Sequence, residues 1–107
     1  MILTDTHTHL YATDFNDDRS LLIENAIKIG VSRFFMPNID SKSIPEMLKL
    51  EQQFPNNCFA MMGLHPCAVN ADYKAELAQM ELLLNNRKFI AIGEIGIDVY
   101  WDKTFFT

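Results

Sequence analysis

The order of apolar segments constrains the fold of this chain more than any other feature. Short runs rich in β-branched and aromatic residues alternate with longer segments whose apolar residues recur at helical spacing. The predicted strands are Ile2–Thr8, Arg33–Met36, Cys58–Gly63 and Phe89–Ile92. The predicted helices run from Asp17 or Asp18 to about Lys28, from Ser41 or Ser43 to about Pro55, and from Tyr73 to about Leu84. This order, β-α-β-α-β-α-β, is typical of parallel strands joined by helical crossovers.

The apolar residues of each helix predict which face is buried. The expected buried positions are Leu22, Ala26 and Ile29 in the first helix, Met47, Leu48 and Leu50 in the second, and Leu77, Met80, Leu83 and Leu84 in the third. The strand 89–92 is apolar on both faces, which is typical of parallel sheets covered by helices. We therefore expect an α/β fold with one core.

Two architectures fit four such units, a small open sheet and the first half of a TIM-like (β/α)8 barrel. The 107 residues suffice for one small domain, whereas a complete barrel needs eight units and typically ~250 residues. The sequence stops at Thr104–Thr107 without a terminal helix. We expect residues 1–107 to form the N-terminal half of a barrel, apparently truncated, whose exposed strand edges favour self-association.

Charge and cysteine content narrow the functional classes. The net charge is −5, and the basic residues are scattered, which excludes the simplest basic surface for binding DNA. If the substrate carries phosphate, bound cations must supply much of the positive charge. The sequence shows neither a secretory signal nor a transmembrane stretch. Two cysteines are too few for a disulfide framework, so we expect a cytoplasmic protein with reduced thiols.

The candidate functional residues gather after the predicted strands, where parallel α/β folds place their sites. His7 and His9 point to the same face of an extended strand, with Cα atoms ~6.6 Å apart. Two imidazoles at that spacing can bind one metal ion, and Asp5 could accept a ring N–H from one of them. The alternative is that the pair is polar decoration of a strand end. The other polar groups at the same end favour metal.

Glu94 and His65 follow two further strands. Glu94 comes directly after an apolar strand and lies between two glycines. A carboxylate there needs a compensating charge, which a metal ion provides; the alternative is a hydrogen-bonded glutamate in a turn. His65 is a candidate for binding substrate phosphate or for acid–base catalysis, and a packing role is the alternative.

The remaining candidates are weaker. Cys67 lies close to His65, but no second cysteine pair has zinc-site spacing, so we reject a zinc site there. Asp98, Tyr100 and Trp101 follow Glu94 in the same loop. Aromatic residues in such a loop could stack on a nucleobase, although packing within the loop is the commoner role.

Three motifs in register resemble a known family. They are DTHTHL at residues 5–10, GLHP at 63–66 and GEIGID at 93–98. Together they resemble the N-terminal part of the TatD family of metal-dependent deoxyribonucleases, which belong to the amidohydrolase-like barrel hydrolases. The resemblance covers essentially the whole chain. It implies that His7 and His9 bind one metal ion, that Glu94 bridges to a second, and that His65 lies near the substrate phosphate. Asp5 and Asp98 are expected to support these groups.

The resemblance implies hydrolysis of phosphodiester bonds in DNA, often from the 3′ end, with Mg²⁺, or with Zn²⁺ or Mn²⁺ in its place. Family members take further histidines and an aspartate from later strands, and this sequence has three histidines in all. Two alternatives therefore stay open. One is a related amidohydrolase acting on a small amide, ester or lactone; the other is an inactive half-barrel that self-associates.

Overall fold

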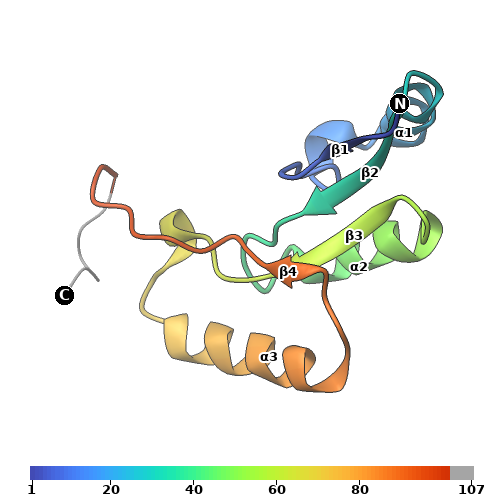
Figure 1. Cartoon of the computed structure of the whole chain (residues 1–107). Coiled ribbons are helices and arrows are strands. Elements are labelled where there is room, and N and C mark those ends of the chain that lie inside the picture. Colours follow the sequence, from blue (N-terminus) through green and yellow to red (C-terminus); the bar gives the residue numbers. More distant parts are fainter. Residues whose placement is uncertain (102–107) are drawn as a thin grey trace.

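The computed structural model describes residues 1–101 and shows four parallel strands, each joined to the next by a helical connection. The strands are β1 (Leu3–Asp5), β2 (Val31–Met36), β3 (Cys58–Met62) and β4 (Ala91–Ile92). They lie side by side in the order β1-β2-β3-β4 (Figure 1). Because each strand pairs with the next one along the chain in the same direction, the structure is half of a TIM-like barrel, as predicted. The chain end at 104–107 lies outside the described residues.

The first strand is shorter than predicted. It ends at Asp5, whose carboxylate accepts a hydrogen bond from the backbone N–H of His7 at 3.1 Å. This local bond turns the backbone out of the strand ladder. The chain then returns to β2, because the amide of Thr8 donates to the carbonyl oxygen of Phe35. His7 and His9 therefore lie in the loop after β1, not on the strand.

The helices are α1 (Arg19–Lys28), α2 (Ile44–Gln53) and α3 (Tyr73–Asn86), with short 3₁₀ turns η1 (Thr13–Phe15) and η2 (Pro66–Ala68). Of the predicted buried positions of α1, Ala26 packs against the core, whereas Leu22 and Ile29 do not. Ile23 is fully buried, whereas Ile29 is 80% exposed and Leu22 is also exposed. Apolar residues occur around most of this helix, so their spacing fits more than one face.

The core lies between the strands and α1 and α2. In α2 the buried residues are Ile44, Met47 and Leu50, so two of the three predicted positions are confirmed and Leu48 is only partly buried. Alternate residues of β3 are fully buried, namely Cys58, Ala60 and Met62. No helix within residues 1–101 is long and apolar enough to cross a membrane.

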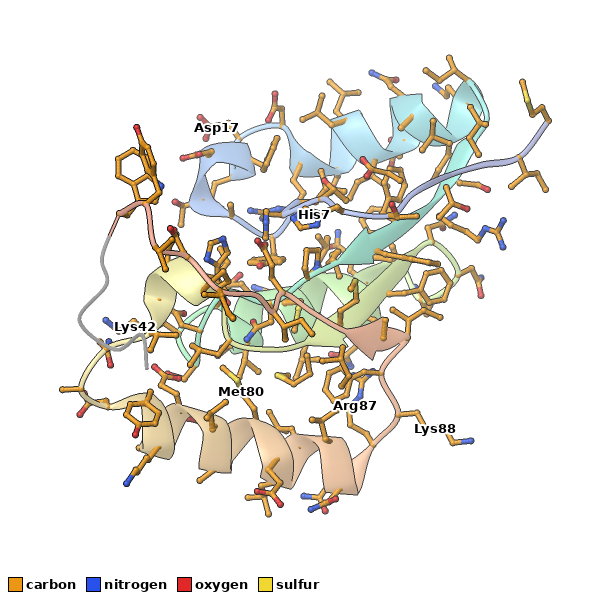
Figure 2. The ribbon with its side chains drawn as sticks, turned by 60° about the vertical axis from the view of Figure 1, so that its left-hand side comes forward. His7, Asp17, Lys42, Met80, Arg87 and Lys88 are labelled. Atoms are coloured by element: carbon orange, nitrogen blue, oxygen red, sulfur yellow. The ribbon has the colours of Figure 1, made fainter. Side chains whose placement is uncertain are left out.

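The side of the molecule formed by α3 and β4 is only partly covered. Met80 is buried and lies on the side of α3 toward the sheet (Figure 2). Leu77 and Leu84 of the predicted stripe are exposed, and so is Ile92 of β4. A groove of about 470 Å³ lies between this helix and the strand. The prediction that the fourth strand is covered on both faces is therefore wrong for the described half-barrel.

Candidate metal centre

Three histidines converge on one carboxylate at the carboxyl ends of the strands. Nε2 of His7 lies 3.2 Å, and Nε2 of His9 3.4 Å, from Oε2 of Glu94. Nε2 of His65 lies 3.0 Å from the other carboxylate oxygen, Oε1. The rings of His7 and His9 meet edge to face, with their centroids 5.2 Å apart, and Figure 2 shows His7 on the segment after β1. The structure thus brings together four residues from three different loops.

The Glu94 carboxylate has the surroundings of a cation ligand. Within residues 1–101, its Oε2 is the buried side-chain oxygen or nitrogen that lacks a hydrogen bond. Two imidazole nitrogens lie near it, but neither meets it with hydrogen-bond geometry. Ligand atoms of His7, His9 and Glu94 all lie within 4.8 Å of one another. A divalent cation between them would satisfy the buried oxygen, so these residues fit a metal ion.

The backbone of Asn38 holds the end of β4 against the end of β2. Its N–H donates to the carbonyl of Gly93 at 3.0 Å, and its carbonyl accepts from the N–H of Glu94 at 3.1 Å. β2 and β4 are not neighbours in the sheet, so these bonds form because the half-barrel curves inward. That curvature brings Glu94 to the histidines of the first loop.

The side chain of Asn38 ties in the end of β3. This residue is fully buried, and its Nδ2 donates to the carbonyls of Gly63 and Asp40, while its Oδ1 accepts from the Ser43 hydroxyl. A Cβ atom on Gly63 would lie 2.7 Å from the carbonyl oxygen of Glu94. Glycine is therefore required at position 63 by the close approach of two backbone segments.

Tyr11 links His9 to the end of β2. Its hydroxyl lies 2.9 Å from Nδ1 of His9 and donates to the carbonyl of Pro37. Burial raises the pKa of Tyr11 to about 12, so the phenol stays protonated at neutral pH. Burial also lowers the pKa of His9 and so favours the neutral imidazole, while the nearby Glu94 carboxylate partly offsets this effect. A neutral imidazole is the form that binds metals.

His65 is held by the turn that follows it. The backbone N–H of Cys67 donates to His65 Nδ1 at 2.9 Å, and the backbone N–H of His65 itself donates to the carbonyl of Ile39. Its Nε2 then faces Glu94. The ring of His65 points at the carboxylate of the cluster, so a role in packing alone does not explain its position.

The two predicted supporting aspartates accept hydrogen bonds from groups in the loops beside the cluster. Asp5 accepts the backbone N–H of His7, where the sequence predicted a ring N–H. Asp98 accepts the backbone amides of Tyr100 and Trp101, and its Oδ2 accepts from the Cys67 thiol at 2.6 Å. This hydrogen bond raises the pKa of the Cys67 thiol and lowers the pKa of Asp98. Both aspartates shape loops beside the cluster.

Tyr100 and Trp101 do not pack into the molecule. They are 79% and 76% exposed, and their rings meet each other edge to face with centroids 4.6 Å apart. The two aromatic residues therefore pack on each other within the loop and leave most of their surface exposed. Stacking on a nucleobase stays a prediction.

Three residues that support the site were not predicted from the sequence: Tyr11, Asn38 and Arg19. Arg19 donates to the carbonyls of Leu10, Tyr11 and Ala12, and so closes the loop that carries His9. The signal for Asn38 was its place directly after Pro37 at a strand end. Tyr11 continues the alternation of His7 and His9, which could have marked it as a partner on the same side.

The structure combines a half-barrel of parallel β/α units with a histidine–carboxylate cluster at the strand ends. These two features are typical of metal-dependent barrel hydrolases. Comparison with known proteins identifies the family. Residues 4–105 match the family model described as TatD related DNase. The chain belongs to this family, as its three motifs predicted.

Named relatives agree with this assignment. The chain is 31% identical over 103 residues to the "Uncharacterized metal-dependent hydrolase YabD" of Bacillus subtilis, covering 96% of this chain and 40% of that protein. It is 29% identical over 94 residues to the "3'-5' ssDNA/RNA exonuclease TatD" of Erwinia tasmaniensis, covering 88% and 36%. The crystal structure of YjjV, a TatD homologue from Escherichia coli, superimposes with a TM-score of 0.83 at 28% identity, covering 94% and 39%. The chain spans about 40% of the length of these relatives.

Proposed function

We propose that His7, His9 and Glu94 bind a divalent metal ion, and that residues 1–107 form the N-terminal half of a barrel that hydrolyses phosphodiester bonds in DNA from the 3′ end. The observation that carries the proposal is the buried Oε2 of Glu94, which lacks a hydrogen bond and faces two imidazole nitrogens. A bound metal ion in such an enzyme activates water and neutralises charge on phosphate oxygens. Glu94 and His65 are the proposed catalytic residues.

Nucleic acid as the substrate is supported by the family, whereas the negative charge of the chain requires bound cations. Several relatives are named 3'-5' ssDNA/RNA exonucleases, and the motifs around His7, His65 and Glu94 match the family pattern. The net charge of −5 provides little attraction for a polyanion. Metal ions would supply the positive charge that faces the phosphate, and the His65 ring would donate a hydrogen bond to it.

The donor set also bears on the metal. Two imidazoles and a carboxylate suit Zn²⁺ or Mn²⁺ in addition to the Mg²⁺ that the resemblance implies. We propose that Glu94 would also bind a second ion, as the resemblance implies. That ion needs further ligands from elsewhere in a barrel, because the three-residue cluster of residues 1–101 serves one ion.

A cleavage assay tests this function. The full barrel, with residues 1–107 as its N-terminal half, is incubated with 5′-labelled single-stranded DNA and, in separate reactions, Mg²⁺, Mn²⁺ or Zn²⁺. We expect metal-dependent shortening from the 3′ end, abolished by His7→Ala and by Glu94→Gln. Glu46→Gln, a matched change of an exposed helical glutamate, should cleave like the unchanged protein. Metal-dependent hydrolysis of a lactone or small amide with intact DNA would instead support the amidohydrolase alternative.

We also propose that two copies of this chain associate through the open edges of the sheet. β1 and β4 are the edge strands, and apolar side chains are exposed on them, such as Leu3 and Ile92, or directly before β4, as Ile90 is. Sedimentation should give a dimer that the double change Ile90→Lys and Ile92→Lys converts to a folded monomer. An unchanged protein that sediments as a monomer would contradict this. The free thiols of Cys58 and Cys67 fit the expected cytoplasmic location.

A further inference from the structure

The hydroxyl of Tyr11 lies between a ring nitrogen of His9 and a backbone carbonyl. Oη is 2.9 Å from His9 Nδ1 and 2.5 Å from the carbonyl oxygen of Pro37. Tyr11 is 3% exposed, and Pro37 is fully buried at the end of β2. The hydroxyl therefore exchanges hydrogen bonds with fixed protein groups.

Counting protons assigns the direction of both bonds. A phenol has one proton, and a carbonyl oxygen only accepts. The Tyr11 proton must lie toward Pro37, because two oxygens 2.5 Å apart would otherwise face each other without a hydrogen. The hydroxyl then offers only a lone pair to His9, so Nδ1 of His9 must carry the hydrogen. In a neutral imidazole this leaves a lone pair on Nε2, the atom that faces Oε2 of Glu94.

The same count gives the opposite result for His65. Its Nδ1 accepts the backbone N–H of Cys67 at 2.9 Å, so this nitrogen carries no hydrogen. The neutral ring must then carry its hydrogen on Nε2, which points at Oε1 of Glu94 from 3.0 Å. Two histidines that face the same carboxylate thus present opposite groups, a lone pair and an N–H.

We propose that Tyr11 is a positioning residue that fixes the Nδ1–H tautomer of His9 and so keeps Nε2 available to a metal ion, whereas the Cys67 amide makes His65 a hydrogen-bond donor to Glu94 or to an anionic substrate. Partners of this kind orient metal-binding histidines in proteins generally. The inference rests on the proposed metal centre and is independent of which substrate the enzyme cleaves.

Nitrogen NMR of the metal-free protein tests the tautomers directly. Long-range ¹H–¹⁵N correlation at mildly alkaline pH distinguishes a protonated ring nitrogen from an unprotonated one. We expect His9 to be protonated on Nδ1 and His65 on Nε2 in the same spectrum. In Tyr11→Phe, His9 should become a mixture of tautomers while His65 stays unchanged. Tyr73→Phe, which removes a hydroxyl from α3, should leave both rings unchanged.

Titration with Zn²⁺ provides the second measurement. Tyr11→Phe should weaken binding by roughly 10–100-fold, the usual effect of losing such a partner, and Tyr73→Phe should bind within about twofold of the unchanged protein. A His9 ring protonated on Nε2 in the unchanged protein would overturn the inference. Weaker binding by Tyr11→Phe without a tautomer change would also overturn it. Failure to cleave DNA would alter neither readout, so the two proposals fail separately.

Discussion

The carboxyl ends of the strands and the face formed by α3 and β4 differ in what their side chains leave unsatisfied. At the strand ends, among residues 1–101, the buried side-chain oxygen of Glu94, Oε2, lacks a hydrogen bond, while Asn38 ties three surrounding segments together. The α3–β4 face instead leaves apolar side chains such as Leu77 and Ile92 exposed around a groove. The first region is therefore organised for a small charged ligand, whereas the second is an apolar surface suited to contact with protein. The proposed site does not depend on covering that surface.

The largest effect on metal binding should come from removing the negative charge of the Glu94 carboxylate, which the histidines surround. Glu94→Gln leaves the shape of the side chain nearly intact but replaces a carboxylate oxygen near two imidazoles. We expect Zn²⁺ affinity, measured by calorimetry, to fall by more than about 100-fold, since even supporting residues typically cost 10–100-fold. Full affinity in Glu94→Gln would contradict the assignment of this carboxylate as a ligand.

Two apolar residues of α3 test whether the α3–β4 face is exposed in solution. Met80 is 3% exposed and Leu77 is 48% exposed. We expect Met80→Ala to lower the free energy of unfolding by about 2–5 kcal/mol and Leu77→Ala to lower it by less than about 1 kcal/mol. Urea denaturation measures both. Equal losses would mean that Leu77 is covered in solution.

Gly63 connects backbone packing to the site. An added Cβ would meet the backbone of Gly93 and Glu94 at 2.7 Å, and these atoms cannot move as a flexible side chain can. We expect Gly63→Ala to reduce the free energy of unfolding by about 1–3 kcal/mol and to weaken Zn²⁺ binding by displacing Glu94. A stability change below about 0.5 kcal/mol, with unchanged binding, would show that the two segments are not in close contact.

The smallest expected effect is on the rates at which the two cysteine thiols are alkylated. Burial raises the pKa of Cys58 to about 12, so this thiol should resist alkylation at pH 8. Cys67 is exposed, but the hydrogen bond to Asp98 raises its pKa and reduces its thiolate fraction. Asp98→Asn should lower that pKa, and iodoacetamide should then modify Cys67 about two- to threefold faster at pH 8. A slower alkylation of Cys67 in Asp98→Asn would contradict the conclusion that Asp98 raises the pKa of this thiol.

The sequence predicted the elements better than the surfaces between them, and its assignment of the site residues stays a prediction. Helical and strand periodicities located the β/α units, because they depend on local spacing. The contact between His7 and Glu94 depends on how the segments after the strands come together, and hydrogen bonds of Asn38, after β2, to Gly93 and Glu94, after β4, hold two of them. Such bonds leave no periodic signal in the sequence. The exposure of Leu77 was equally hidden, since an amphipathic pattern does not say whether its apolar face is covered.

The most direct test of the proposed metal centre is X-ray absorption at the zinc edge of the Zn²⁺-loaded protein. We expect two imidazole nitrogens at about 2.0–2.1 Å from the zinc ion and a carboxylate oxygen at about 2.0–2.2 Å from it. In Glu94→Gln and His7→Ala, zinc should no longer bind at equimolar concentration. A sulfur ligand at about 2.3 Å, as expected if Cys67 held the ion, or a spectrum without imidazole scattering, would contradict the account.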